Sequence, residues 1–401
     1  MDLAVILLLC LNLRSDKGRF IFYFAGALTC LGPADITVAK IAYLIILTVI
    51  TTLQFRKIRE DGQLSDYFAK TSKIINCLFI FLVYEFSISF LLDISLISIL
   101  RSYLPYILFL FSLPIMYKCK DSFSESFITV SVLTFANLSA FSVWFLWSQR
   151  HGLHIFPIER IGLDAEWIAF FGFIYALRFQ TDTKSLSVLN LVSLIGIPTF
   201  LILSLSRTNL IFIFAIIISH FLLFRRNFLV TSFYMSVFLV SSIVISRFLP
   251  GDVVSKTVDR FSSTFQLFQI GGLSEQGLGM DLSIYLRRQQ TQFAKDHFIE
   301  NWLIGSGTLP EGQSFDTIWG SLMQYGTIGS ILFLVLISAI CWQLVSNDSI
   351  FRKHFLIYFF LLVPASVIYN WPSNKSFWLA NSLLFALSHS KFNKSSELSD
   401  E

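Results

Sequence analysis

The stretch IINCLFIFLVYEFSISFLL, residues 74–92, decides the fold. It holds a single charged residue, Glu85, and a helix of about 20 mostly apolar residues is long enough to cross the hydrocarbon core of a bilayer. Similar runs recur almost from end to end, and 55% of the 401 residues are apolar while only 14% are charged. Because the runs are continuous rather than alternating, they favour helices over a transmembrane barrel. We therefore predict an all-α polytopic integral membrane protein.

The apolar runs predict roughly 11 to 13 transmembrane helices, of which the first two are short for a complete crossing. The candidate spans cover residues 3–13, 20–32, 36–53, 74–92, 103–117, 127–147, 166–179, 186–205, 208–224, 228–249, 318–345, 354–371 and 376–389. They form a transmembrane block over residues 1–249 and a second one over residues 318–401. A long polar loop with an amphipathic helix, residues 250–317, separates the two blocks.

The lysines and arginines of the short connectors predict the orientation. Most of the 30 basic residues fall in alternate connectors, and short basic loops stay in the cytoplasm. The long loop is therefore expected outside the cell membrane, and the tail from Ser388 to Glu401 inside. The net charge of +4 has to be considered loop by loop, and it indicates no nucleic-acid partner.

The second half of the long loop carries most of the candidate chemistry. Its sequence YLRRQQTQFAKDHFIENWLIGSG, residues 285–307, predicts an amphipathic helix followed by a glycine turn. Arg287 and Arg288 near its start could bind a diphosphate, or could simply be the solvated face of an interfacial helix. His297 and Glu300 are spaced for one helical face, where they could orient or deprotonate a hydroxyl group.

Four further residues on the expected outer side are candidates. Arg207 lies between two apolar runs with almost no loop to solvate it, so it either reaches lipid headgroups or binds a substrate phosphate. Arg150 and Arg160 could guide an anionic ligand or flank the interface. Asp316 precedes a span, and either caps that helix or acts as a general base. The sequence has no metal-binding cluster and no nucleotide-binding glycine motif, so we expect no metal or cofactor.

Taken in order, these motifs resemble the superfamily of O-antigen polymerases (Wzy-type) and O-antigen ligases. The resemblance rests on Ser206-Arg207-Thr208, on Arg287 eighteen residues before Gly305-x-Gly307, and on Asp316 followed by Trp319, Gly326 and Gly329. It implies a GT-C-like helical bundle in the inner membrane of a bacterium, with the long loop in the periplasm. It also implies glycan substrates on undecaprenyl diphosphate, whose diphosphate would be held by Arg207 and Arg287. The bilayer, a chain-length regulator and a flippase are then the expected partners.

Within this resemblance the sequence favours a polymerase over the alternatives. Ligases commonly have a histidine near the start of the span after the long loop, where this chain has Ser314-Phe315-Asp316. A flippase or other transporter would be expected to carry charges within its spans and repeated halves, but we find such charges only at Lys40 and Glu85 and no clear repeat. We therefore expect an inverting glycosyl transfer with undecaprenyl diphosphate as the leaving group.

Overall fold

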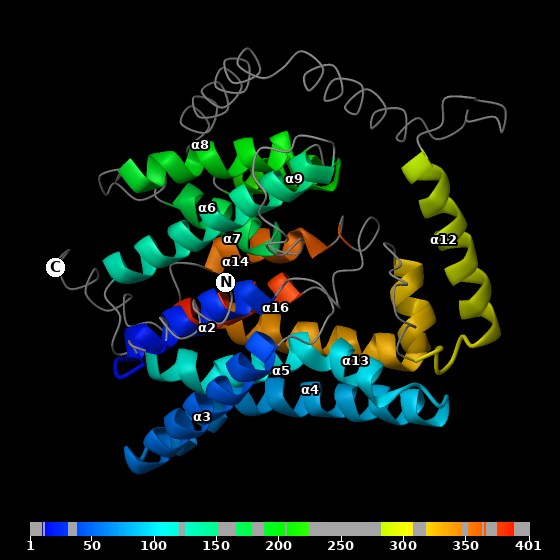
Figure 1. Cartoon of the computed structure of the whole chain (residues 1–401), viewed down its shortest axis with the longest axis horizontal. Coiled ribbons are helices and arrows are strands. Elements are labelled where there is room, and N and C mark those ends of the chain that lie inside the picture. Colours follow the sequence, from blue (N-terminus) through cyan, green and yellow to red (C-terminus); the bar gives the residue numbers. More distant parts are fainter. Residues whose placement is uncertain are drawn as a thin grey trace.

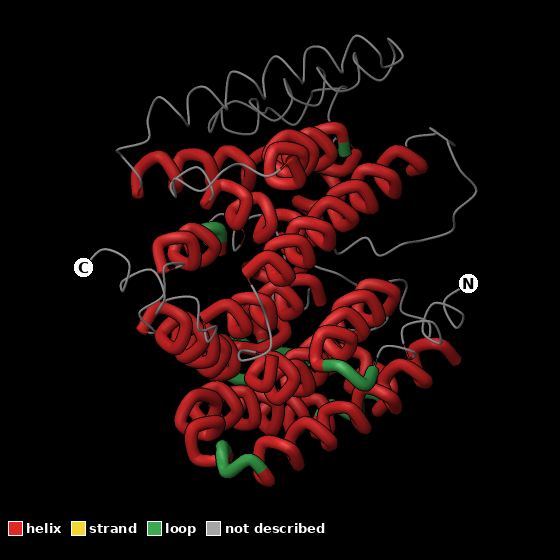
Figure 2. Tube along the Cα trace, turned by 90° about the vertical axis from the view of Figure 1, so that its left-hand side faces the viewer, coloured by secondary structure: helices red, strands yellow, loops and turns green. Residues whose placement is uncertain are grey.

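The computed structural model describes residues 10, 13–30, 38–119, 125–150, 166–178, 188–204, 207–223, 282–307, 318–346, 352–362, 365 and 375–388. These residues form helices joined by short turns, with no strand among them (Figure 2). The helices are α2 (Asp16–Cys30), α3 (Val38–Glu60), α4 (Leu64–Leu91), α5 (Leu96–Cys119), α6 (Glu125–Arg150), α7 (Glu166–Arg178), α8 (Val188–Leu203), α9 (Arg207–Leu223), α12 (Leu282–Glu300), α13 (Ile318–Ser346), α14 (Arg352–Phe360) and α16 (Lys375–Ser388).

Five of the described helices are long and apolar enough to cross a membrane, which makes the chain an α-helical membrane protein. These segments are Lys40–Glu60, Leu64–Leu91, Leu96–Lys118, Ser126–Phe145 and Trp319–Ser346. Helices α7, α8, α9 and α16 contain shorter apolar segments that match predicted spans. The predicted span at 228–249, and nearly all of that at 3–13, lie outside the described residues.

The helices pack in layers around a buried centre (Figure 1). Helices α3 and α4 and the long part of α13 lie on one side, and α6, α8 and α9 lie on the other, with α2, α7, α14 and α16 between them. Aromatic side chains fill the centre: the ring of Trp378 in α16 lies 4.8 Å from that of Tyr106 and 5.3 Å from that of Phe109 in α5. Helix α12 stands apart from these layers at one end of the bundle and runs across it.

Helices α3 and α4 extend well beyond the apolar runs predicted for them. Ion pairs one helical turn apart support the polar extensions, Arg56 with Glu60 at 2.7 Å and Lys70 with Asp66 at 2.8 Å. The turn between the two helices is fixed by Lys118 of α5, which donates to Asp61 and to Gln63. Hydropathy alone identifies only the apolar part of such a helix, so the two predicted segments were too short.

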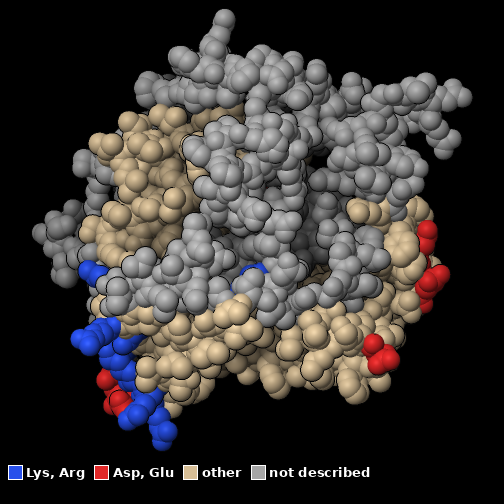
Figure 3. All heavy atoms as spheres, viewed as in Figure 1, with Lys and Arg blue, Asp and Glu red and all other residues tan. Residues whose placement is uncertain are grey.

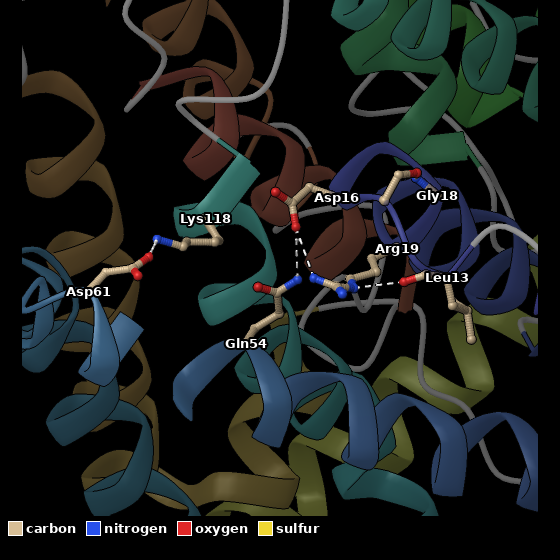
Figure 4. A network of polar contacts seen from close by, with 8 residues as sticks. Leu13, Asp16, Gly18, Arg19, Gln54, Asp61 and Lys118 are labelled. Carbon is tan, nitrogen blue, oxygen red and sulfur yellow. Dashed lines mark hydrogen bonds and ion pairs between the residues drawn. The ribbon is translucent and has the colours of Figure 1, made fainter. Parts of the chain in front are cut away.

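Polar contacts near this end of the bundle also tie α2 to α3 (Figure 4). Arg19 donates to Asp16 at 2.9 Å and to the carbonyl of Leu13 at 2.9 Å, and Gln54 donates to the same Asp16 carboxylate at 3.3 Å. Figure 3 shows Lys and Arg atoms together with some Asp and Glu atoms at the lower left, where α3 ends, and further Asp and Glu atoms at the right.

Candidate functional site at the break in α13

Helix α13 is broken near its beginning. Gly326 has φ 63° and ψ −172°, a conformation outside the helical range, which divides the element into a short arm at 318–325 and a long arm at 327–346. Figure 1 shows the short arm turned away from the long one, beside α12. The span predicted over residues 318–345 matches the bounds of α13, but the sequence did not reveal the break at Gly326.

The turn that follows α12 supplies the hydrogen bonds that the broken helix lacks. On one side of the break, the amides of Ser306 and Gly307 donate to the carbonyls of Met323 and Gln324 at 2.7 and 3.0 Å. On the other side, the amides of Thr327 and Ile328 donate to the carbonyls of Trp302 and Leu303 at 2.8 and 3.1 Å. Non-helical backbone at membrane depth is stable only when protein or water satisfies its polar groups, and here protein does.

Glycines allow the two backbones to come this close. Gly305 has φ +77°, and a β-carbon there would lie 2.4 Å from the amide nitrogen of Gly326. Gly329 makes room for the ring of Tyr84, whose hydroxyl shares its one hydrogen between the carbonyls of Ile304 and Tyr325 at 3.0 and 3.2 Å. Helix α4 thus holds the turn and the break together.

A buried carboxyl group lies next to the break. Glu85 of α4 is only 3% exposed, and its Oε1 accepts a hydrogen bond of 2.7 Å from Nε2 of Gln324. Its Oε2 and the buried hydroxyl of Ser306 have no hydrogen-bond partner in the described part of the chain. The phenol groups of Tyr106 and Tyr325, 3.2 Å apart, lie within electrostatic range of this carboxyl.

Sequence reasoning recognised Glu85 only as a charge within a span, and it missed Gln324. Glu85 lies near the end of α4, six residues and about 9 Å before Leu91. It is therefore at the level of the turn rather than in the middle of the helix. The signal available in the sequence was the charge itself, since an acidic residue in a span needs a partner.

Helix α12 packs beside the short arm of α13. Ala294 and Met323 are buried at this contact, and the rings of Phe298 and Trp319 lie 6.0 Å apart. The helical repeat puts position 287 on the same face of α12 as Ala294 and Phe298, and position 288 on the face of the exposed Lys295 and Ile299. The two adjacent arginines therefore occupy different faces of the helix.

His297 and Glu300 lie at the C-terminal end of α12, away from the buried contact. The His297 ring lies 3.9 Å from that of Phe293, and its Nδ1 is 3.2 Å from the Phe293 carbonyl one turn earlier. Glu300 is exposed at the last position of the helix. The structure thus places both residues in the last turn of α12, which leads into the turn that is bonded to the Gly326 break.

The remaining candidates are placed by their elements. Arg207 is the first residue of α9, and Arg150 is the last residue of α6. The C-terminal ends of α6 and α8 lie together, since the rings of Trp144 and Phe200 are 5.5 Å apart. In Figure 1 these helix ends lie at the end of the bundle that carries α12. Arg160 and Asp316 lie outside the described residues.

The described residues near the break offer hydrogen-bonding chemistry rather than metal coordination. Within the ranges that the structure describes, no group of three His, Cys, Asp or Glu residues could hold a metal ion. The site consists of a carboxyl, an amide, several phenols and a serine hydroxyl, and it is bounded by the α12 helix that carries Arg287.

Together these features define an α-helical membrane protein with a discontinuous helix at one end of its bundle. No protein-family model matches the chain, and no curated protein matches it either.

Proposed function

We propose that this protein is a polysaccharide polymerase of the inner membrane of a bacterium, with a GT-C-like bundle of roughly 11 to 13 spans. A non-reducing-end hydroxyl of one lipid-linked repeat unit attacks the anomeric carbon of the growing chain. Undecaprenyl diphosphate leaves from the opposite side, and the anomeric centre is inverted. The donor is already activated, so the reaction needs no nucleotide sugar and no cofactor.

One observation carries the proposal: two of the motifs behind the resemblance, Gly305-x-Gly307 and Gly326 with Gly329, belong to one structural unit. Gly305 and Gly307 dock on the break at Gly326, and Gly329 seats the Tyr84 ring that closes the contact. The α12 helix that bears Arg287 leads directly into this unit. Gly307 and Gly326, 19 positions apart in the chain, are thereby brought together at one end of a membrane bundle.

The proposed roles follow from charge. Arg287 and Arg207 stabilise the negative charge that develops on the departing diphosphate, because a guanidinium stays charged and binds phosphate oxygens through two parallel hydrogen bonds. Arg150, Arg160, Arg288, His297 and Glu300 bind the substrate at the rim. Asp316 takes the proton from the attacking hydroxyl.

The glycan pattern of a strain lacking the protein tests this function. Loss of a polymerase leaves single repeat units on the lipid A core, and the wild-type chain should restore the ladder of longer products. An O-antigen ligase defect would instead leave no repeat units on the core while lipid-linked polymer accumulates, and that pattern would refute the proposal in favour of the ligase.

A second candidate is a transporter of the same lipid-linked unit. It is favoured by the discontinuous α13 beside the buried Glu85, because transporter sites are commonly formed where helices unwind and a charged side chain lies within the bundle. Purified protein in detergent, mixed with lipid-linked repeat units, separates the two functions. Polymer formed without any membrane compartment supports the polymerase, whereas transport has no product under these conditions.

A further inference from the structure

We infer that the turn between α12 and Gly305 is an anchor in the membrane interface, and that lipid of the adjoining leaflet covers its exposed side chains. The turn presents three consecutive apolar side chains to the outside: Trp302, Leu303 and Ile304 are 56%, 45% and 40% exposed. Ile299, in the last turn of α12, adds a fourth at 61%. A run of large exposed apolar side chains marks an interaction surface.

The exposure is built into the turn, because its backbone is fixed. The carbonyl of Trp302 accepts from both the amide and the hydroxyl of Thr327, each at 2.8 Å. The carbonyl of Leu303 accepts from the amide of Ile328, and that of Ile304 accepts from the hydroxyl of Tyr84. All three carbonyls are thus bound to α13 or α4 while their side chains remain exposed.

The turn continues a surface that already faces lipid. Ile328 and Ile331, in the long arm of α13 that follows the break, are exposed and belong to a membrane-spanning segment. Phe86 and Phe90 are exposed near the end of α4, and the same end of that helix contacts the turn through Ser89 and Gly307.

Charged residues close to the turn mark where the apolar surface ends. Asp93 follows the end of α4, and Glu300 directly precedes the turn. An apolar surface that ends in tryptophan and charge is the pattern of a membrane interface rather than of a hydrocarbon core or an aqueous loop. This continuity favours lipid over a protein partner as the occupant.

Tryptophan fluorescence in lipid nanodiscs tests the inference without reference to any enzyme activity. The full chain is reconstituted in phosphatidylcholine brominated either near the headgroup or deep in the acyl chain. The fluorescence of Trp302 is obtained by subtracting the emission of Trp302→Phe from that of the wild type. Two further variants provide reference values by the same subtraction. Trp342→Phe reports an exposed tryptophan of the membrane-spanning α13, and Trp378→Phe reports a fully buried one.

We expect bromine to quench Trp302 about as strongly as Trp342 and far more than Trp378, with the shallow bromines more effective than the deep ones. A Trp302 contribution as insensitive to bromine as that of Trp378 would overturn the inference. In that case aqueous iodide identifies what surrounds the turn: quenching means water, and protection means a protein partner. Trp302→Leu repeats the subtraction should the phenylalanine variant assemble poorly.

Discussion

Gly305 and Gly326 are in backbone contact: a β-carbon on either residue would lie 2.4 Å from the amide nitrogen of the other. Both have positive φ, at 77° and 63°, so each would resist a side chain even without its neighbour. This contact joins the turn after α12 to the break in α13.

The glycine contact predicts the first result. Gly305→Ala and Gly326→Ala should each lower the melting temperature of the purified protein strongly, because steric overlap adds to the left-handed conformational cost of about 1–2 kcal/mol. Gly62→Ala is the matched control, since Gly62 has φ +68° but no atom within 4 Å of the added β-carbon. Equal losses at all three positions would show that the backbone contact contributes nothing.

The buried carboxyl predicts a second result. Glu85→Ala should destabilise the protein by about 1–3 kcal/mol or more, because it leaves the buried amide of Gln324 unpaired and opens a cavity. Glu85→Gln keeps an acceptor oxygen and should lose less. Unfolding by denaturant in detergent measures both, with the exposed Ser87→Ala of the same helix as the control. If Glu85→Gln were as harmful as Glu85→Ala, the hydrogen bond to Gln324 would not be the stabilising contact.

The arginines predict a third result, which depends on the proposed function. Arg287→Ala and Arg207→Ala should each abolish polymer, since one well-placed donor contributes about 10²- to 10³-fold in rate. Lysine should rescue poorly because it lacks the planar fork of two donors. Arg288→Ala should be milder, because position 288 lies on the exposed face of α12. Gel analysis of polymer in cells with equal protein levels measures all of these, and near-normal polymer from Arg207→Ala would make that residue a headgroup anchor.

The role of Asp316 is tested by comparing two replacements. Asparagine can cap a helix but cannot accept a proton at neutral pH, so Asp316→Asn should lose the roughly 10²- to 10⁴-fold contribution of a general base. Asp316→Ala should fail as well, whereas Asp316→Glu should retain some polymer. Wild-type polymer from Asp316→Asn would exclude the base and direct attention to His297 and Glu300.

The turn between α3 and α4 predicts a pH dependence of stability. The hydrogen bond from the Lys118 ammonium lowers the pKa of the Asp61 carboxyl. A lowered pKa in the folded state stabilises the protein at pH values above the ordinary pKa of about 3.9, and this stabilisation is lost as the pH falls through the folded value. Asp61→Asn should therefore lower the melting temperature at pH 7, and the difference from wild type should shrink below about pH 4. A difference that stayed constant with pH, or that persisted in a Lys118→Met background, would contradict the ion pair.

The sequence was sufficient to predict helices, because apolar runs such as residues 74–92 leave few alternatives in lipid. It could not predict the break in α13. Gly326 and Gly329 were visible, but the atoms that replace the missing helical hydrogen bonds belong to residues 302–307 of a preceding turn.

Only those site residues that belong to a local sequence pattern could be predicted. Arg287 and Gly305 could be selected because a local pattern of charge and glycine surrounds them. The Glu85–Gln324 hydrogen bond joins residues 239 positions apart, and no local pattern contains both. Long-range pairings of this kind depend on how the helices pack, which hydropathy does not determine.

The same pairing also has a consequence for biosynthesis. At typical translation rates of about 5–20 residues per second, the 239 residues between Glu85 and Gln324 take on the order of 12 to 48 seconds to synthesise. Throughout that interval α4 is already available for insertion while the amide that Glu85 will bind does not yet exist. Until then the carboxyl is neutralised by protonation or is satisfied by water or another partner. Final closure of the α4–α13 contact is therefore a late step, which is possible only after Gln324 of α13 has left the ribosome.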